Sequence, residues 1–381
     1  MSAAFINADM LAWARERAGI DIGALAAKLS VKEEKLDAWE RGESRPTFRQ
    51  AQNFAHHVHV PFGYLFLNNP IKEELPIPDL RTVGSERPRK ISVDLRDTIR
   101  DVLKRQQWYG DYQRDRGVEP VRAVGRRDVV SDSVSEIVTD MKELLGLTRW
   151  PSRGDWEDYF RDLVRRIESI GVLVMRNSMV GGNRFRPLRV EEFRGFSVVD
   201  KYAPAIFINT ADCPEARLFT LIHELAHIWF GRSGISDTRP RRGKGVEAVC
   251  NAVAAEFLAP AEEFLGDWDN EVEWARNLPP LAAKFHVSQW VIARRALELG
   301  LIDRGEYNGF ADARQKAHEN RERENKRISF FQLQPSRISK RFAQAVASEA
   351  LGGRILLRDA SSLLGIKPHR VAEFAKKELG S

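Results

Sequence analysis

The feature that most constrains this sequence is an apolar segment, residues 218–229, that carries two histidines four positions apart. Its centre reads His223-Glu-Leu-Ala-His227. Residues four apart lie on one face of an α-helix, so both imidazoles can reach one metal ion. Glu224 lies beside them, where its carboxylate can take a proton from a metal-bound water. This HExxH pattern is typical of zinc peptidases, whose metal keeps one position open for that water.

A third protein ligand is required, and a second predicted helix supplies the candidates. Residues 245–260 are rich in alanine and end at a proline, which favours a helix that stops there. We predict that Glu247 binds the metal and that Asn251, one turn later, supports it or a neighbouring group. Glu256 is the competing acid, and the thiol of Cys250 on the same segment is a further possible ligand, although most acids on helices are simply solvated.

Five ordered pieces between about residues 171 and 260 carry a family resemblance. They are residues 192–196, 204–209, 219–227 and 234–237, and Glu247-x-x-x-Asn251 followed by Phe257-Leu-x-x-Pro260. Together they resemble the ImmA/IrrE family of metallopeptidases. The resemblance implies that zinc is held by His223, His227 and Glu247, with Glu224 as the catalytic base. It also implies cleavage of transcriptional repressors in response to stress or mobile-element signals.

The N-terminal part, residues 7–67, is predicted to form five short helices. Residues 21–31, with Trp39-Glu-Arg-Gly42 and Pro46-Thr47, resemble the XRE (Cro/repressor-type) DNA-binding domain. In such a unit the second helix of the pair can enter the DNA major groove. The acidic pair Glu33-Glu34 repels phosphate, so the alternative is a fold kept for protein docking or dimerisation. The candidates for phosphate contact are Lys32, Lys35, Arg41 and Arg45.

Three short β-branched or aromatic runs predict one small sheet. They are residues 171–175, 195–199 and 205–209. An edge strand near the metal can hold an extended substrate by backbone pairing. Arg194 and Asn209 flank this sheet and are candidates for substrate contact, although ion pairing and turn capping are the more expected roles.

The predicted fold class is α+β: a mainly helical, multidomain chain with a small sheet in its peptidase part. Arg294 and Arg295 in a second helix-turn-helix-like stretch are candidates for DNA contact, but we expect them to face water. The predicted domains are an XRE-like helix-turn-helix domain (1–69), a Pro-rich linker and charged helix (70–130), an ImmA/IrrE-like zinc peptidase domain (131–275), a helix-turn-helix-like segment with a basic tether (276–330) and a small helical unit (331–381).

Composition and charge indicate where the protein works but do not identify its binding partner. The net charge of +6 over 381 residues permits nucleic-acid binding but does not require it. The two cysteines, Cys213 and Cys250, cannot form a disulfide framework and fit a reducing cytoplasm, and we expect ordinary buried thiols. No apolar run approaches the ~20 residues that span a bilayer, and the first residues lack a signal-peptide pattern. We therefore expect a cytoplasmic protein without membrane contact.

Two functions follow from these patterns. The first is a zinc-dependent endopeptidase and DNA-binding transcriptional regulator that cleaves a repressor-type protein in a stress or mobile-element response. Its partners would be operator DNA and the protein substrate, and a homodimer is expected by analogy, because XRE-like domains often bind DNA as dimers. The alternative is an antitoxin-like or regulatory DNA-binding protein whose peptidase fold binds a toxin without turnover. A purely structural zinc site is least expected, because such sites fill four positions.

Overall fold

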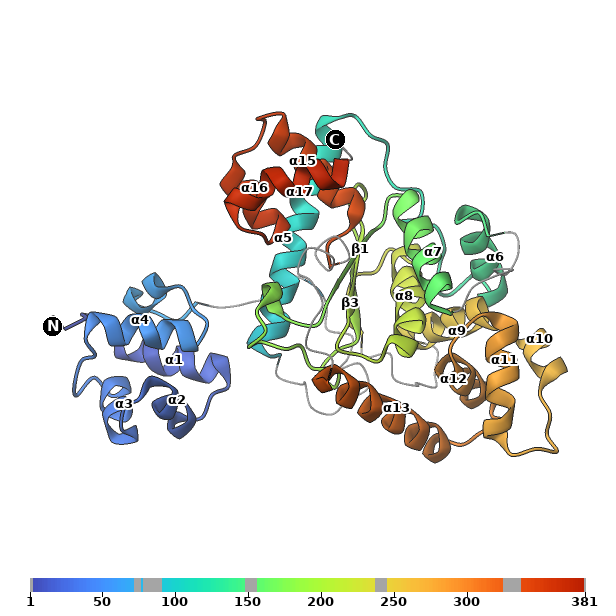
Figure 1. The fold of residues 1–381 in the computed structure, drawn as a ribbon, viewed down its shortest axis with the longest axis horizontal. Coiled ribbons are helices and arrows are strands. Elements are labelled where there is room, and N and C mark those ends of the chain that lie inside the picture. The colour runs from blue at the N-terminus through green and yellow to red at the C-terminus, as the bar shows by residue number, and fades with distance from the viewer. Residues whose placement is uncertain are drawn as a thin grey trace. The chain divides into compact units, whose positions relative to one another are not determined.

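A computed structural model describes most of the chain (Figure 1). The described residues are 3–71, 77, 91–147, 156–236, 245–324 and 337–379. They fall into two compact units, residues 3–71 with 91–97, and residue 77 with 98–379. The predicted linker of residues 70–89 lies mostly outside the described residues, as does the end of the predicted tether. The finer division into five segments stays a prediction.

The first unit consists of five short helices, as the sequence predicts. Asp21 caps the second of them, because its side chain accepts hydrogen bonds from the backbone N–H groups of Gly23 and Ala24. Fully buried Leu25, Leu36 and Phe54 form the centre of a separate small core. The elements are α1 (Ala8–Ala18), α2 (Ile22–Leu29), α3 (Glu33–Glu40), α4 (Phe48–His57) and the 3-10 helix η1 (Phe62–Phe66).

The second unit contains a four-stranded mixed sheet in the order β1-β3-β2-β4. β1 (Leu173–Asn177) pairs parallel with β3 (Ala205–Asn209), and β2 (Gly195–Val198) pairs antiparallel with both β3 and β4 (Gly234–Ser236). Three of these strands are predicted by the apolar runs. β4 has only three residues, which is too short for an alternating apolar pattern to predict it.

Helices cover both faces of this sheet and extend beyond it. In Figure 1, α5 lies on one side of the sheet and α8 on the other. The helices are α5 (Val93–Asp115), α6 (Val134–Leu144), α7 (Trp156–Ser169), η3 (Val180–Gly182), α8 (Pro214–Trp229), α9 (Val246–Leu258), α10 (Ala261–Asp267), η4 (Trp274–Asn277), α11 (Leu278–Phe285), α12 (Gln289–Leu299), α13 (Arg304–Glu324), α15 (Lys340–Leu351), α16 (Leu357–Leu364), η5 (Pro368–Arg370) and α17 (Val371–Leu379). The fold is thus α+β and mainly helical, as predicted. No helix among the described residues is both long and apolar enough to cross a membrane.

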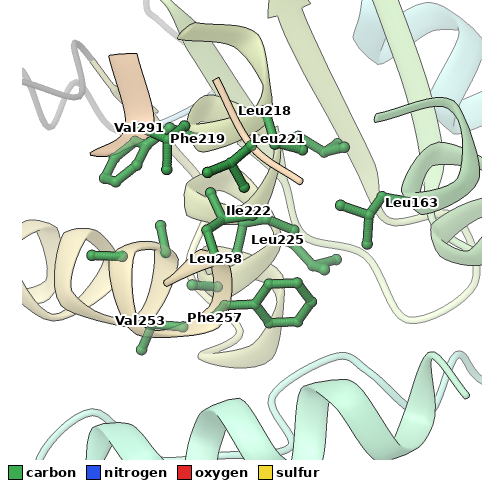
Figure 2. Close-up of a cluster of buried hydrophobic side chains, with 14 of the residues drawn as sticks. Leu163, Leu218, Phe219, Leu221, Ile222, Leu225, Val253, Phe257, Leu258 and Val291 are labelled. Atoms are coloured by element: carbon green, nitrogen blue, oxygen red, sulfur yellow. The ribbon is translucent and has the colours of Figure 1, made fainter. Parts of the chain in front are cut away.

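The main core is built around α8 (Figure 2). Ile222 and Leu225 of α8 are fully buried, and they belong to one cluster with Leu163 of α7 and Phe257 of α9. Burying each such side chain contributes about 1.5–3 kcal/mol to folding. Because α8 is enclosed on nearly all sides, the polar residues in its middle are carried into the interior with the apolar ones.

A buried carboxylate fixes the end of α8. The Trp229 indole Nε1 donates to Asp140 of α6 at 2.8 Å, and Arg126 and Arg127 donate to the same carboxylate at 2.8–3.1 Å. Burial alone would raise the pKa of Asp140, but the hydrogen bonds from Arg126, Trp229 and Arg127 outweigh burial and hold this pKa below its usual range.

We expect Asp140→Asn to lower the free energy of unfolding by about 2 kcal/mol, because charge-assisted hydrogen bonds are lost. The native pKa lies below the unfolded value, so this carboxylate stabilises the fold above about pH 4 and stops doing so as pH falls through the native pKa. Urea unfolding at several pH values should therefore show a shallower acid dependence in the variant. Asp115→Asn, at an exposed position, is the matched control and should change stability by less than about 0.5 kcal/mol.

Candidate metal centre

The two histidines and the acid between them lie in the middle of α8. Pro214 stands at the first turn of the helix, where its missing N–H costs nothing, and left-handed Gly231 follows its end. His223, Glu224 and His227 have no exposed surface. Buried polar groups need partners, so this helix must face a second set of polar atoms.

That second set comes from α9, which packs directly against α8. The Nε2 atoms of His223 and His227 are 3.3 Å apart. The Glu247 carboxylate approaches both of them, at 3.5 Å from His223 Nε2 and 3.0 Å from His227 Nε2. One candidate ligand atom from each residue lies within 4.8 Å of the other two. The three side chains therefore converge on one point and can hold a metal ion there.

The charges in this cluster depend on burial and on close neighbours. Burial lowers the pKa of His227, and the nearby His223 lowers it further. Burial would raise the pKa of Glu247, but hydrogen bonds from both histidines outweigh burial and leave this pKa well below its usual range. The cluster thus offers nitrogen lone pairs and an ionised carboxylate, the donors that borderline divalent metals accept.

Glu224 provides an independent test of whether the site fits a metal centre. Both of its carboxylate oxygens are buried and lack a short, well-directed hydrogen bond from the described residues. Burial, and then the negative charge of Glu247, raise the pKa of Glu224 well above its usual range, and they outweigh the lowering effect of the nearby Ser236 and Ser197 hydroxyls. A buried carboxylate with too few hydrogen-bond donors destabilises the folded state unless a further group completes the site. A metal ion with a bound water would supply that group, so the donor set fits a metal.

Two small residues of the sheet shape the same site. Ser236 on β4 places its Oγ 3.4 Å from His227 Nε2 and 3.5 Å from Glu247 Oε1. Gly195 on β2 leaves room for the catalytic candidate, because an added Cβ would lie 2.9 Å from Glu224 Oε1 and 3.0 Å from the Phe207 carbonyl oxygen. Sequence reasoning missed both residues. Gly195 opens a strand run and Ser236 lies in a family-like piece, but neither pattern reveals that the residue lies beside the His223–His227–Glu247 cluster.

We expect Gly195→Ala to destabilise the protein by about 1–3 kcal/mol and to lower its activity. The methyl group would also come within 2.8 Å of Thr220 Cγ2, so it overpacks the contact between sheet and helix. Thermal unfolding and activity of the same preparation measure both effects. Gly266→Ala is the matched control, because a Cβ there meets no atom within 4 Å. Wild-type stability in Gly195→Ala would contradict the close approach.

The competing candidates on α9 lie elsewhere. Glu256 pairs with Arg295, and its carboxylate accepts from the backbone N–H of Ala261 at the start of α10. Cys250 is buried outside the three-residue cluster, and burial raises the pKa of its thiol well above the usual range. Asn251 is buried one turn beyond Glu247. Its supporting role stays a prediction.

The other candidates on the second unit are engaged in structural contacts. Arg194 forms an ion pair with Asp212, and the Asn209 side chain bonds the Phe193 carbonyl and the Ala211 N–H, each at 3.0 Å. These are the ion-pairing and turn-capping roles that the sequence favoured. The expectation that Arg294 and Arg295 face water is wrong.

Burial of these arginines has a simple cause. α12 packs against α8, α9 and α13, so few of its positions face solvent. Arg294 is 1% exposed and donates to Glu298 at 3.1 Å, while Arg295 is 6% exposed and pairs with Glu256 and Glu298. Neither arginine is available to a nucleic acid.

The four basic candidates in the first unit do not converge on one site. Arg41 is paired with Asp37 at 2.6 Å and with Glu43 at 3.4 Å. The other three lie at separate points in and around α3. Lys32 precedes its first turn, the ammonium of Lys35 in α3 lies 5.8 Å from the Trp39 ring, and the Arg45 guanidinium lies 4.3 Å from the Phe5 ring.

Two parts of the chain match models of protein families. Residues 168–297 match the M78 peptidase family model, described as the IrrE N-terminal-like domain. This match spans the sheet and both helices of the metal cluster, and it supports the peptidase part of the family resemblance. Residues 338–377 match a domain of unknown function, DUF8813. No curated protein and no solved structure matches the chain. Neither family match covers residues 1–167, so the XRE-like domain stays a prediction.

Proposed function

We propose that this chain is a zinc-dependent endopeptidase. The observation that carries the proposal is the buried convergence of His223, His227 and Glu247 beside Glu224, whose two oxygens lack a short, well-directed hydrogen bond from the described residues. The three converging residues would hold the metal. When bound, zinc would acidify a water molecule and polarise the peptide carbonyl. A zinc site with three protein ligands keeps the open position that catalysis needs.

Glu224 would move the proton in this reaction. Its free oxygens can accept a proton from the attacking water and then pass that proton to the leaving amine of the substrate. Burial raises the pKa of this carboxyl group, which makes the carboxylate a stronger base than an exposed one and suits the first step. Gly195 keeps the space beside this carboxylate open, and Ser236 holds the metal-binding face of Glu247 and His227.

We further propose that the substrate is a repressor-type protein and that the first unit binds operator DNA in the cytoplasm. The resemblance to regulators that cut repressors supports this substrate, as does the M78 match over residues 168–297. The helix pair α2–α3 with its tight turn supports DNA binding through Lys32, Lys35, Arg41 and Arg45. Glu33 and Glu34 in the first turn of α3 weigh against a tight phosphate contact there.

A second candidate function is an antitoxin-like regulator that binds a toxin without turnover. The complete burial of His223, Glu224 and His227 favours it, because a protein substrate must reach these side chains before it is cut. Under this alternative the metal cluster would stabilise the fold, and Glu224 would be dispensable for regulation.

New protein N-termini in host cells that express the wild type or Glu224→Gln separate the two functions. The substitution removes the base but leaves the three metal-binding side chains in place. We expect a peptide end that appears only with the wild type, which would also identify the substrate. Identical sets of N-termini under several stresses would contradict the peptidase and favour the toxin-binding alternative.

A further inference from the structure

Three helix pairs in this chain share one turn geometry. They are α2–α3, α11–α12 and α16–α17. In each pair the first helix ends at a left-handed residue, which is followed by a β-branched residue whose N–H bonds the carbonyl five positions back. The left-handed residues are Ser30, His286 and Gly365 (φ 55°, 53° and 67°), and the N–H···O bonds are Val31 to Ala26 (3.0 Å), Val287 to Ala282 (3.1 Å) and Ile366 to Ser361 (3.2 Å).

The apolar pattern around the turn is also shared. Five positions after the β-branched residue, each second helix places a fully buried apolar side chain, and these are Leu36, Ile292 and Val371. A tight turn between two short helices with this packing is the helix-turn-helix arrangement, whose second helix can enter the DNA major groove. What distinguishes the three pairs is therefore the surface that each second helix presents.

Among the three pairs, only the third has a second segment with an excess of basic residues that are not buried, two of which (Lys367 and Arg370) precede α17. α12 buries both of its arginines, Arg294 and Arg295. The segment 32–41 around α3 has three basic against four acidic residues, two of them in its first turn. The segment 367–379, which contains α17, has four basic residues against two acidic ones. Because duplex DNA carries a dense negative charge, the third pair suits it best.

Three lysines of the segment 367–379, one before α17 and two in its last turn, face solvent. Lys367, Lys376 and Lys377 are exposed, and none of them forms an ion pair with another described residue. The opposite face of the helix is covered, since Val371 is fully buried and Phe374 is 2% exposed. α17 and α16 both pack against α15.

Helix α5 packs against the small group of helices that contains α17. The Phe342 ring of α15 packs on Trp108 of α5, with ring centroids 5.7 Å apart. Arg105 of α5 donates to the Leu363 carbonyl at the end of α16, at 2.8 Å. α5 thus contacts α15 and the end of α16. In the first turn of α16, Arg358 is exposed and pairs with the exposed Asp359.

We propose that residues 337–379 bind duplex DNA, with α17 in the major groove and Lys367, Lys376 and Lys377 on the phosphates. This assigns a nucleic-acid contact to the part of the chain that matches a domain of unknown function. The inference goes beyond the proposed peptidase and does not depend on turnover. It places a second DNA contact at the opposite end of the sequence from the predicted XRE-like domain.

The test measures binding of the full-length chain to a fluorescent duplex at 50–200 mM salt. The triple variant Lys367→Ala/Lys376→Ala/Lys377→Ala should bind at least ~10-fold more weakly, with a salt slope smaller by about 2–3, since each phosphate contact contributes roughly 0.9 to that slope. Glu373→Gln removes the exposed acid of the same helix and should strengthen binding roughly threefold.

Two matched variants make the result specific. Arg184→Ala/Arg189→Ala/Lys201→Ala removes three exposed charges elsewhere and should leave the salt slope nearly unchanged. Lys32→Ala/Lys35→Ala/Arg45→Ala tests the first unit separately. An unchanged affinity and slope in the α17 variant would overturn the proposal. So would a full chain that binds no duplex at 50 mM salt, and the exposed Leu356 and Leu357 would then mark a protein contact instead. Peptidase activity is a separate readout and does not enter this test.

Discussion

Glu224→Gln should lower the rate of peptide cleavage by a factor on the order of 10²–10⁴ while the protein keeps its metal. The amide has nearly the shape of the carboxylate but cannot accept the proton of the attacking water. The contacts among His223, His227 and Glu247 do not involve this side chain, so metal binding should persist. Activity on the substrate found in cells and metal content per chain are measured on the same preparation.

The outcome distinguishes a base from a residue that only supports the fold. If Glu224 only supported the fold, its loss would lower thermal stability. A neutral amide in place of a buried carboxylate whose charged form is disfavoured should instead leave stability unchanged or raise it. Full activity in Glu224→Gln would contradict its role as the base, even if the metal is bound as proposed.

Glu247→Gln should remove most of the bound metal and lower activity by about 10³-fold or more. The carboxylate supplies the anionic donor of the cluster, and the metal contributes several kcal/mol to catalysis. Inductively coupled plasma mass spectrometry should find close to one metal ion per chain in the wild type and far less in the variant.

Glu256→Gln is the matched control, because it makes the same chemical change on the same helix. Glu256 pairs with Arg295 and accepts from the Ala261 N–H, so its loss should lower stability by about 1–3 kcal/mol and leave the metal in place. Loss of metal in Glu256→Gln, with retention in Glu247→Gln, would reverse the assignment of the third ligand.

Features of the fold that depend on residues close in sequence could be predicted from the sequence alone. The spacing of His223 and His227 predicts a shared helix face, and α8 places both side chains at one point. Helix capping also depends on neighbours in sequence: Ser133 and Glu136, three positions apart, form the reciprocal capping box that opens α6.

Features that depend on packing between residues far apart in sequence could not be predicted. β4 is too short to show a period, yet its pairing with β2 brings Ser236 to the metal cluster. Arg294 looks like a surface residue, and its burial depends on Glu298 and on the Phe219 ring, which lies 4.7 Å away. Charged residues are rarely buried unless paired, and the partner comes from three-dimensional packing rather than from the spacing of one helix.

The coordination of bound zinc tests the central claim most directly, and X-ray absorption at the zinc edge of the loaded wild-type protein measures it. We predict two imidazole nitrogens and carboxylate oxygen at about 2.0–2.2 Å, one further exchangeable oxygen, and no sulfur. A sulfur shell near ~2.3 Å would place Cys250 or Cys213 on the metal and contradict the His223–His227–Glu247 site. A protein that binds no zinc would contradict the account altogether.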